Sequence, residues 1–553
     1  MPVPVTADRP LQATACLPFL RIPPFPGSKI DRFRMPEPDL AEHHLPGDLS
    51  DLLRELRVGG SFWAAKPELP ESYILVRSHA AIEHSATGNG ELPVVFWPES
   101  NQSVVKIARN IVTGECDPWH MLSDAEALIT DQNGELVLIA AILGVAVHVC
   151  DPKTGELRRC EPDITGLLHE LVSAAGYLDP FTGKPISARE TVQLLGFWRR
   201  LIDANRGMAG GLGFAFWKQD NIAALLWGGD GPFEFFRSDA DIHERSGPVA
   251  VWRSKTPIGA LASLEDKGRA LIEVEDGFLR SQGLGADCIP PLSITVDRLG
   301  AYFDPGRPSE LENLLQNGEF DARSLERARH LRQVIVEAGL SKYSRGDEAI
   351  SRPSGSRRHI LVPGQVEDDR SVQLGGCGLT ANLDLLVRVR QEAPDACILY
   401  KPHPDVLAGH RKGIIPEEQC VRFADEIVGE ESISALIGMV DEVHVNTSLA
   451  GFEALMRGKP VTTYGVPFYA GWGLTRDFGP VPSRRNATRT LDELVAAALL
   501  SYPRYLDPAT GLPCPPEVVV ARLIDGEVPD TSLLVAARRL QGKVLRSVRS
   551  LVQ

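Results

Sequence analysis

At 553 residues, the chain is too long to form a single hydrophobic core, and we expect several domains. A hydrophobic fraction of 43% with 24% charged residues is that of a globular protein and argues against extensive disorder. The formal net charge of −15 argues against a nucleic-acid partner, because a surface that binds phosphates needs a basic excess.

The chain shows no sign of a membrane span or of a secretory signal. Its longest apolar run, residues 136–149, is too short to cross a bilayer and holds a glycine where a helix would end and a strand begin. The N-terminus has no basic region leading into an apolar core. Nine scattered cysteines without CxxC spacing indicate reduced thiols and predict no zinc site. We therefore expect a cytoplasmic protein without a bound metal.

Two pairs of segments show an internal repeat. Residues 123–149 resemble residues 439–464, and each segment reads as a strand, a loop, a helix, a glycine at the helix end and a second strand. Downstream, residues 168–185 and 491–513 share the pattern YLDPxTGxP, which is too long to arise by chance. The repeat predicts two related α/β domains, a duplication rather than a solenoid.

The two copies differ in the polar residues that a site needs. In the second copy the helix begins at Ser448, a good N-cap, and carries Glu453 in its second turn. Gly134 and Ile139 stand in those places in the first copy. The second copy continues into GVPFYAGWGLTRD, whereas the first continues into CDPKTGEL. The first copy is therefore expected to be a degenerate domain that kept its scaffold and lost its site.

The repeat and the composition divide the chain into four expected parts. A polar junction with glycine and proline, residues 344–358, separates the last two α/β domains. The parts are a degenerate α/β domain at 1–178, a second α/β domain at 179–345, the intact copy at 355–525 and a tail at 526–553.

The stretch LIEVEDG, residues 271–277, reads as a buried strand that ends on two adjacent carboxylates. Ligands of open α/β folds gather at the carboxyl ends of parallel strands, so Glu275 and Asp276 are placed to face a substrate. The alternative is that Asp276 caps the next turn and Glu275 is solvated. Position alone does not decide between the two interpretations.

Polar residues also follow four predicted strands of the C-terminal half, within residues 359–376, 398–406, 443–460 and 464–473. Together they suit an anionic nucleotide sugar. The helix that Ser448 opens offers N–H groups to phosphate, and Lys401 and a protonated His403 add charged donors. Glu453 can accept both ribose hydroxyls. The candidate residues for donor binding are Gln365, Lys401, His403, Pro404, Thr447, Ser448 and Glu453.

These segments resemble a known family. The motifs EDGFLRSQGLG, PGQVEDDRSV, YKPHPDV, NTSLAGFEALMRGKPVTTYGVPFYAGWGLT and DPATGLP are similar to those of the KpsC/LipA family of capsule polysaccharide β-Kdo transferases, cytoplasmic enzymes that use CMP-Kdo. The resemblance covers residues 180–515. It implies an α/β, GT-B-like glycosyltransferase with two Rossmann-like domains, an acceptor-side domain at 179–345 and a CMP-sugar-binding domain at 355–525. Family members often carry two modules in tandem, so the degenerate Rossmann-like domain at 1–178 resembles the remnant of a first module.

The resemblance assigns expected roles to single residues of the CMP-sugar-binding domain. His403 and Pro404 match the family's His-Pro element, in which the His serves the phosphate. Ser448 and Glu453 match the positions for phosphate and ribose.

On the acceptor side, Asp276 matches the family's candidate nucleophile, with Glu275, Arg280 and Ser281 beside it. Arg253 departs from the pattern, because Gly is expected after the Trp of VWRSKTP. The role of that loop is therefore open.

The reaction that the resemblance implies would use the acids at the end of this strand, Glu275 and Asp276. The donor is β-linked CMP-Kdo and the family's product is β-linked, so configuration is retained. Retention by two displacements needs a carboxylate on the face opposite the leaving group, and Asp276 is the expected nucleophile. Gly277 lets the backbone turn, and Arg280 offsets the donor's carboxylate. The reaction requires no metal and no cofactor besides the donor substrate.

The expected partners are CMP-Kdo, a lipid-linked saccharide acceptor, the capsule assembly and export machinery and an anionic inner-membrane surface. The membrane expectation rests on residues 531–553, which carry five cations and no acid, interleaved with apolar residues at helical spacing. This tail either lies peripherally on the inner membrane or packs on its own domain.

Two alternative functions stay open at this point. The chain could transfer the sugar of a different CMP donor, because the His-Pro element does not encode the sugar. It could also be a non-catalytic component of capsule assembly or export that binds glycolipid. The presence of Asp276, His403 and Glu453 argues against the second alternative.

Overall fold

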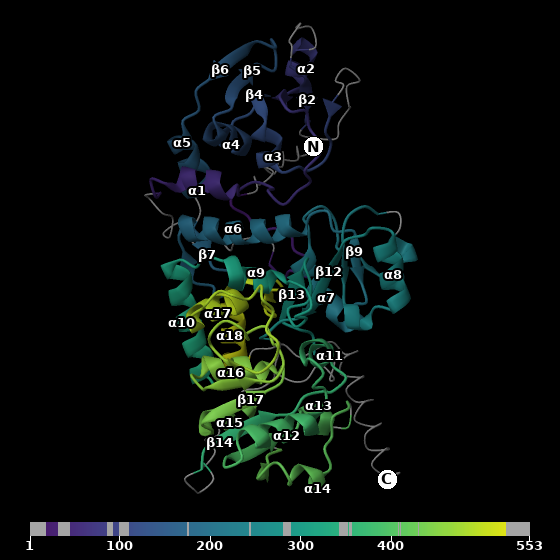
Figure 1. The fold of residues 1–553 in the computed structure, drawn as a ribbon. Coiled ribbons are helices and arrows are strands. Elements are labelled where there is room, and N and C mark those ends of the chain that lie inside the picture. Colours follow the sequence, from purple (N-terminus) through teal and green to yellow (C-terminus); the bar gives the residue numbers. More distant parts are fainter. Residues whose placement is uncertain are drawn as a thin grey trace, which may run out of the picture. The chain divides into compact units, whose positions relative to one another are not determined.

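The chain forms two compact units in the computed structural model (Figure 1). Unit 1 comprises Met1–Pro24, Ile30–Arg206 and Gly228–Gly231, and unit 2 comprises Phe25–Lys29, Gly207–Trp227 and Pro232–Gln553. Within these ranges, the residues that the structure describes are 18–30, 45–85, 92–98, 110–173, 176–242, 245–279, 289–341, 352, 357–407, 409, 411–429 and 431–526.

Unit 1 contains one six-stranded sheet, the N-sheet, with the order β3-β2-β1-β4-β5-β6. Strands β1 to β5 are parallel, and β6 runs antiparallel to β5. The strands are β1 Tyr73–Val76, β2 Val94–Phe96, β3 Asn110–Ile111, β4 Ala125–Thr130, β5 Ala146–Cys150 and β6 Leu157–Cys160. The helices are α1 Leu49–Leu56, α2 His79–Ser85, α3 Pro118–Ser123, α4 Glu135–Leu143, α5 Ile164–Leu168 and α6 Ala188–Asn205. A π-helical turn, His169–Ser173, and a hairpin of β7 Tyr177–Leu178 and β8 Pro185–Ile186 connect α5 to α6.

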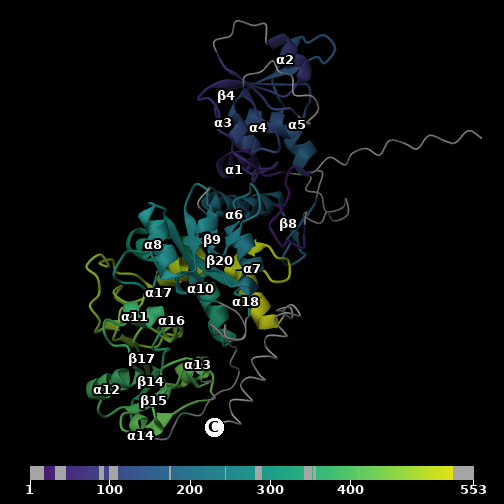
Figure 2. The ribbon, with the colours of Figure 1, turned by 90° about the vertical axis from the view of Figure 1, so that its right-hand side faces the viewer.

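Unit 2 contains two sheets. The first, the M-sheet, has the order β10-β9-β11-β12-β13-β20-β21. Its first four strands are parallel, and β13, β20 and β21 each run antiparallel to the preceding neighbour. Figure 2 shows that the C-terminal strand β20, far along the chain, returns among the elements around β9 and α7. The strands are β9 Gly210–Leu212, β10 Phe235–Phe236, β11 Val249–Val251, β12 Leu271–Asp276, β13 Ser293–Asp297, β20 Pro503–Leu506 and β21 Pro513–Cys514.

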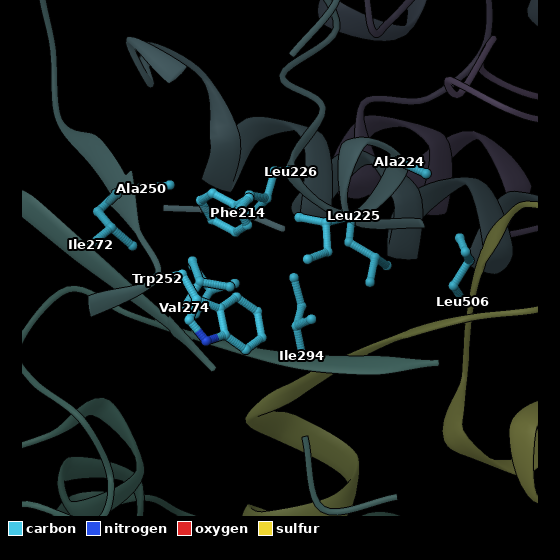
Figure 3. Packing of buried hydrophobic residues seen from close by; sticks show 12 residues of the cluster. Phe214, Ala224, Leu225, Leu226, Ala250, Trp252, Ile272, Val274, Ile294 and Leu506 are labelled. Atoms are coloured by element: carbon cyan, nitrogen blue, oxygen red, sulfur yellow. The ribbon is translucent and has the colours of Figure 1, made fainter. Parts of the chain in front are cut away.

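A hydrophobic core holds the M-sheet to helix α7, Phe216–Leu226 (Figure 3). Leu225 and Leu226 of α7 are fully buried against Val274 of β12 and Ile294 of β13. Leu506 of β20 belongs to the same core, so the C-terminal return of the chain is packed as well as hydrogen-bonded. The remaining helices of this half are α8 Ile258–Asp266, α9 Glu310–Asn317, α10 Ala322–Glu337, α17 Leu491–Val495 and α18 Pro516–Asp525.

The second sheet of unit 2, the C-sheet, is parallel throughout and has the order β16-β15-β14-β17-β18-β19. All residues of β14 and β15 are buried, as expected for strands that helices cover on both faces. The strands are β14 His359–Pro363, β15 Cys397–Lys401, β16 Glu426–Ile427, β17 Glu442–Val445, β18 Val461–Thr463 and β19 Arg476–Asp477. The helices are α11 Arg370–Gly375, α12 Asn382–Glu392, α13 Pro404–Leu407, α14 Glu417–Cys420, α15 Ile433–Met439 and α16 Leu449–Met456.

The N-sheet and the C-sheet confirm the predicted repeat. Counted in chain order, both sheets place their strands as 3-2-1-4-5-6, the Rossmann order. The units β4-α4-β5 and β17-α16-β18 occupy the same places, and Gly134 and Ser448 are the N-caps of α4 and α16. The copies differ at the last strand, because β6 is antiparallel where β19 is parallel. The fold is thus α/β and GT-B-like, preceded by a degenerate copy of its C-terminal Rossmann-like domain.

The YLDPxTGxP segments form matching hairpins in the two units. The hydroxyl of Tyr177 donates to the carbonyl of Val172 at 3.0 Å, and that of Tyr505 donates to Leu499 at 2.9 Å. Each acceptor lies in or beside a π-helical turn, His169–Ser173 in unit 1 and Ala496–Ser501 in unit 2. The tyrosine of the repeated YLDPxTGxP sequence therefore donates to a carbonyl of the π-helical turn in both units.

One expected domain boundary differs from the structure, and one expected segment lies almost wholly outside the described residues. Unit 1 does not end near residue 178 but continues through α6 to Arg206. The basic tail at 526–553 lies outside the described residues, apart from Gly526. Among the helices that the structure describes, none has the length and apolar character needed to cross a membrane.

The two hairpins predict a difference in stability. Asp507 is fully buried and accepts hydrogen bonds from Thr510 Oγ1 at 2.8 Å and from Arg522 Nε at 2.9 Å. Asp507→Ala removes the buried carboxylate that pairs with Arg522 and should lower the free energy of unfolding by about 3 kcal/mol or more. Asp179→Ala removes the matching bond to Thr182 and should cost about 1 kcal/mol. Urea unfolding followed by tryptophan fluorescence measures both, and equal losses would contradict this account.

Candidate functional site

Unit 2 contains a cavity of about 1010 Å³, to which the carboxyl ends of strands in both the M-sheet and the C-sheet contribute. It collects nine of the predicted site residues, which come from segments up to 178 positions apart in the sequence. These are Glu275, Asp276, Gln365, Lys401, His403, Pro404, Thr447, Ser448 and Glu453. The predicted Arg280 and Ser281 lie outside the described residues.

Asp276 ends β12 and forms an ion pair with Lys218, a residue that the sequence did not point to. Lys218 Nζ lies 3.0 Å from Asp276 Oδ1, and the lysine comes from the first turn of α7. The ammonium also lies 3.5 Å from the ring centroid of Trp252. Asp276 therefore faces the cavity as half of an ion pair.

Glu275 also faces the cavity, where it meets Arg370 of α11. Arg370 Nη1 lies 3.1 Å from Glu275 Oε1 and 3.4 Å from Glu273 Oε2. Glu273 is 4% exposed and also pairs with Arg253 at 2.9 Å. Arg253, which departs from the family pattern, thus neutralises the buried carboxylate of Glu273. Glu275 contacts Arg370 and is not solvated as the alternative interpretation required.

The two adjacent acids have different cationic neighbours. Burial raises the pKa of Glu275 to about 8, an effect that Arg370 opposes and the neighbouring Asp276 reinforces. Glu275 is therefore largely neutral near pH 7, whereas Asp276 lies against the ammonium of Lys218. One carboxyl of the pair can donate a hydrogen bond, and the other can act as an anion.

On the C-sheet side, the segment before α16 is held by Gln365. The side-chain amide of Gln365 donates to Thr447 Oγ1 at 2.8 Å and accepts from Thr447 N at 3.0 Å. Ser448 then caps α16 by accepting from Ala450 N at 3.3 Å. The amide thereby fixes the point at which the helix presents its N-terminus to the cavity, where an anion is favoured.

His403 and Lys401 follow strand β15. The backbone N–H of Asp405 donates to His403 Nδ1 at 3.1 Å, which places the proton of a neutral imidazole on Nε2. Lys401 Nζ donates to the carbonyl of Gly429 at 3.1 Å. Burial lowers the pKa of Lys401, and the carboxylate of Glu431 opposes that shift.

Two further carboxylates line the cavity, one in the predicted segment 398–406 and one outside the predicted segments. Glu431 Oε2 and Asp405 Oδ1 are buried, and neither has a hydrogen-bond partner among the described residues. Buried acceptors of this kind need N–H or O–H donors, and a bound ligand would supply them. No sequence signal marked Glu431, because the short polar run VGEES around it is typical of a loop.

The aromatic loop at 464–473 contributes mainly to packing. Tyr469 and Trp472 are fully buried. Phe468 reaches the cavity and stacks on Phe278 with ring centroids 4.7 Å apart. This loop of the C-sheet half therefore packs against the segment that follows the two acids.

The corresponding place in unit 1 is filled by the chain itself. Arg21 Nη1 lies 2.7 Å from Glu135 Oε1 in the first turn of α4, and Arg21 Nη2 lies 2.8 Å from Ser61 Oγ. Ile139, at the position of Glu453, is fully buried. Across the described parts of both units, no group of three or more His, Cys, Asp or Glu side chains is arranged to hold a metal ion.

Comparisons with known proteins agree with this arrangement. A family model described as capsule polysaccharide biosynthesis protein matches residues 248–505. Over 369 residues, the chain is 38% identical to the capsule polysaccharide modification protein LipA of Neisseria meningitidis serogroup A, a match that covers 65% of this chain and 52% of that protein. Over 239 residues, it is 48% identical to the lipopolysaccharide-processing protein LpsZ of Rhizobium meliloti, covering 42% of this chain and 54% of that protein.

A solved structure extends the match. The KpsC β-Kdo 2,4 transferase of Thermosulfurimonas dismutans is 33% identical with a TM-score of 0.50, and the match covers 58% of this chain and 99% of that one. The chain belongs to the capsule polysaccharide biosynthesis family, within its KpsC/LipA type, which confirms the resemblance seen in the motifs. It spans about half the length of the curated relatives it matches.

The raised pKa of Glu275 predicts a dependence of stability on pH. The unfolded chain releases this proton near the ordinary pKa of 4.5, whereas the folded chain holds it to about 8. The stability that the neutral acid contributes is therefore complete below pH 4.5 and is lost as the pH rises through about 8. Glu275→Gln should flatten the fall in unfolding temperature between about pH 5 and about pH 9.

Differential scanning calorimetry across this pH range checks the effect. Glu418→Gln, which changes an exposed carboxylate on α14 outside the cavity, serves as the control and should keep the wild-type profile. A Glu275→Gln profile with the wild-type slope would show that Glu275 is ionised in the folded protein.

Proposed function

We propose that the chain is a retaining glycosyltransferase of capsule polysaccharide biosynthesis that moves β-Kdo from CMP-Kdo to a lipid-linked saccharide. One observation carries the proposal: a single cavity holds the acids at the end of β12 together with the helix N-terminus at Ser448 and the imidazole of His403. A nucleotide sugar would contact both the C-sheet half and the M-sheet half of this cavity, since its phosphate and its anomeric carbon are adjacent.

The C-sheet half suits the nucleotide. The α16 N-terminus and Nε2 of His403 offer N–H donors to the phosphate of CMP, and Lys401 adds a cation close by. These donors stabilise the charge that develops on the phosphate when CMP leaves. The hydrogen bonds between Gln365 and Thr447 hold the segment that leads into the α16 N-terminus.

A carboxylate that accepts both ribose hydroxyls completes the nucleotide site. Glu453, 5% exposed in α16, lines the cavity and is the residue that the motif favours. Glu431 is the second candidate, because one of its oxygens is buried in the cavity without a partner among the described residues.

The M-sheet half suits the sugar. Asp276, paired with Lys218, attacks the anomeric carbon of Kdo, and the carbon–oxygen bond to CMP breaks with its electron pair leaving on the phosphate. The acceptor hydroxyl then attacks the same carbon from the vacated face and releases its proton to the solvent, and the electron pair of the ester bond returns to Asp276. Two inversions retain the configuration. Glu275, largely neutral, does not add a second anion beside the nucleophile.

The relatives support this reading of the site. The solved KpsC domain that this chain matches over 99% of its length is titled a β-Kdo 2,4 transferase, and the LipA protein is named for capsule polysaccharide modification. We propose a cytoplasmic location with the basic tail on the anionic inner membrane, where a lipid-linked acceptor would be reached.

CMP release tests the proposal directly. Purified protein mixed with CMP-Kdo and a Kdo-terminated glycolipid should release CMP and lengthen the glycolipid by one β-linked Kdo, whereas Asp276→Asn should do neither. Release of CMP from CMP-sialic acid but not from CMP-Kdo would assign a different donor. A wild-type protein that binds the glycolipid without consuming any CMP sugar would support a non-catalytic role in assembly or export.

Calorimetric binding of CMP tests the nucleotide half. The full chain should bind one CMP, because Arg21 and Ile139 fill the corresponding place in unit 1. Glu453→Gln should weaken binding by on the order of 1.5 to 3 kcal/mol, the value of a charge-assisted hydrogen bond. Glu431→Gln is the matched comparison, and the larger loss identifies the carboxylate that holds the ribose.

The control for both variants is Glu418→Gln, outside the cavity, which should bind CMP as the wild type does. Two CMP sites per chain would contradict the degenerate-copy interpretation. Unchanged affinity in both Glu453→Gln and Glu431→Gln would place the ribose elsewhere.

A further inference from the structure

Lys218 occupies the sugar half of the cavity beside the proposed nucleophile. It is 7% exposed, and its Nζ lies 3.0 Å from Asp276 Oδ1. The same ammonium lies 3.5 Å from the ring centroid of Trp252 and 5.1 Å from that of Trp217. Aromatic faces attract a cation and fix its position. The lysine is therefore held by Asp276 of β12, by Trp252 after β11 and by Trp217 of its own helix.

The local backbone is shaped to place this lysine. After β9 the chain turns at Gly213, where φ is +83° and a Cβ atom would lie 2.2 Å from Thr256 Oγ1. Only glycine tolerates both the conformation and the close approach. Helix α7 then begins at Phe216 and carries Lys218 to the carboxyl end of β12. A lysine this deeply buried is costly to keep charged unless its partners are fixed, which points to a use for the charge.

We propose that Lys218 bridges the carboxylate of Asp276 and the carboxylate of the bound donor, and so positions the nucleophile for attack on a sugar that is itself anionic at the reacting carbon. The inference rests on the proposed function. The anomeric carbon of Kdo carries a carboxylate, so the attacking oxygen and this substituent come within a few ångströms of each other. Like charges repel more strongly in a cavity walled by protein than in water. A cation already in contact with the nucleophile offsets that repulsion.

The same contact selects the donor. A sugar without a carboxylate at its anomeric carbon would leave the ion pair between Lys218 and Asp276 undisturbed, and the nucleophile would stay engaged in it. Donors of the keto-acid class compete for the ammonium and draw it toward the reacting carbon. The arrangement therefore favours keto-acid sugars as a class, through charge rather than through the shape of the ring.

Lys218→Met tests the role, because methionine keeps a long apolar stem among the tryptophans and removes only the charge. Single-turnover CMP release from CMP-Kdo should slow on the order of 100-fold. The KM for CMP-Kdo should rise, while the Kd for CMP alone, measured by calorimetry, should stay within about threefold of the wild type, because CMP carries no sugar carboxylate. Lys218→Arg keeps the charge and should recover part of the rate.

The matched control is Arg245→Gln, which removes an exposed cation from its 2.6 Å ion pair with Glu234 in the same half of unit 2, outside the cavity. It should keep the wild-type rate. A Lys218→Met variant with the wild-type rate would overturn this inference and leave the proposed function standing. A Lys218→Met variant that loses both its CMP binding and its folded state would show that the lysine is purely structural, and so would a Lys218→Arg variant that recovers none of the rate. Either result would also overturn the inference. A wild-type protein that releases no CMP from CMP-Kdo overturns the proposed function, and the inference with it.

Discussion

The hydrogen bonds of Arg370 to Glu273 and Glu275 are the contact on which the arrangement of the site depends. Arg370 begins α11 in the C-sheet half and reaches Glu273 and Glu275 on β12 of the M-sheet. Glu273 is almost fully buried, so it must be neutralised, and Arg253 shares that task from its own sheet. An arginine that donates hydrogen bonds to two carboxyl groups of another sheet holds the carboxyl ends of the two sheets toward each other. The acids at the end of β12 and the polar residues of the C-sheet therefore line the same cavity.

The second consequence of this contact is a division of charge between neighbours. Glu275 and Asp276 are adjacent in β12, yet burial raises the pKa of Glu275 to about 8, while Asp276 has its own cation in Lys218. Two ionised carboxylates at this place would repel each other and the anionic donor. In the proposed reaction, a largely neutral Glu275 beside the ion-paired Asp276 would supply one hydrogen-bond donor and one nucleophile from two residues of the same chemical type.

The fold could be predicted because its determinants are local and occur twice. The strand–helix–strand pattern around Ser448 and the YLDPxTGxP hairpin each appear again in unit 1 with the same topology and the same tyrosine hydrogen bond. Strand ends that carry acids or a His-Pro pair also located the cavity. Lys218 could not be found in this way, since its partner is 58 positions away and nothing in the sequence around it marks a site. Arg370 lies within the motif PGQVEDDRSV, but its partners Glu273 and Glu275 are 97 and 95 positions away. Glu431 lies in a short polar run that is typical of a loop. Gln365 was expected to contact the donor, whereas both ends of its amide bind Thr447, a pairing that only the three-dimensional arrangement reveals.

The central claim is that Asp276, and not its neutral neighbour, forms a covalent bond to the sugar. Mass spectrometry of the protein mixed with CMP-Kdo in the absence of acceptor measures this directly. We expect one Kdo adduct, on the peptide that contains residues 271–279, with fragmentation placing it on Asp276, and no adduct in Asp276→Ala. An adduct mapped to Glu275, or full turnover by Asp276→Ala, would contradict it.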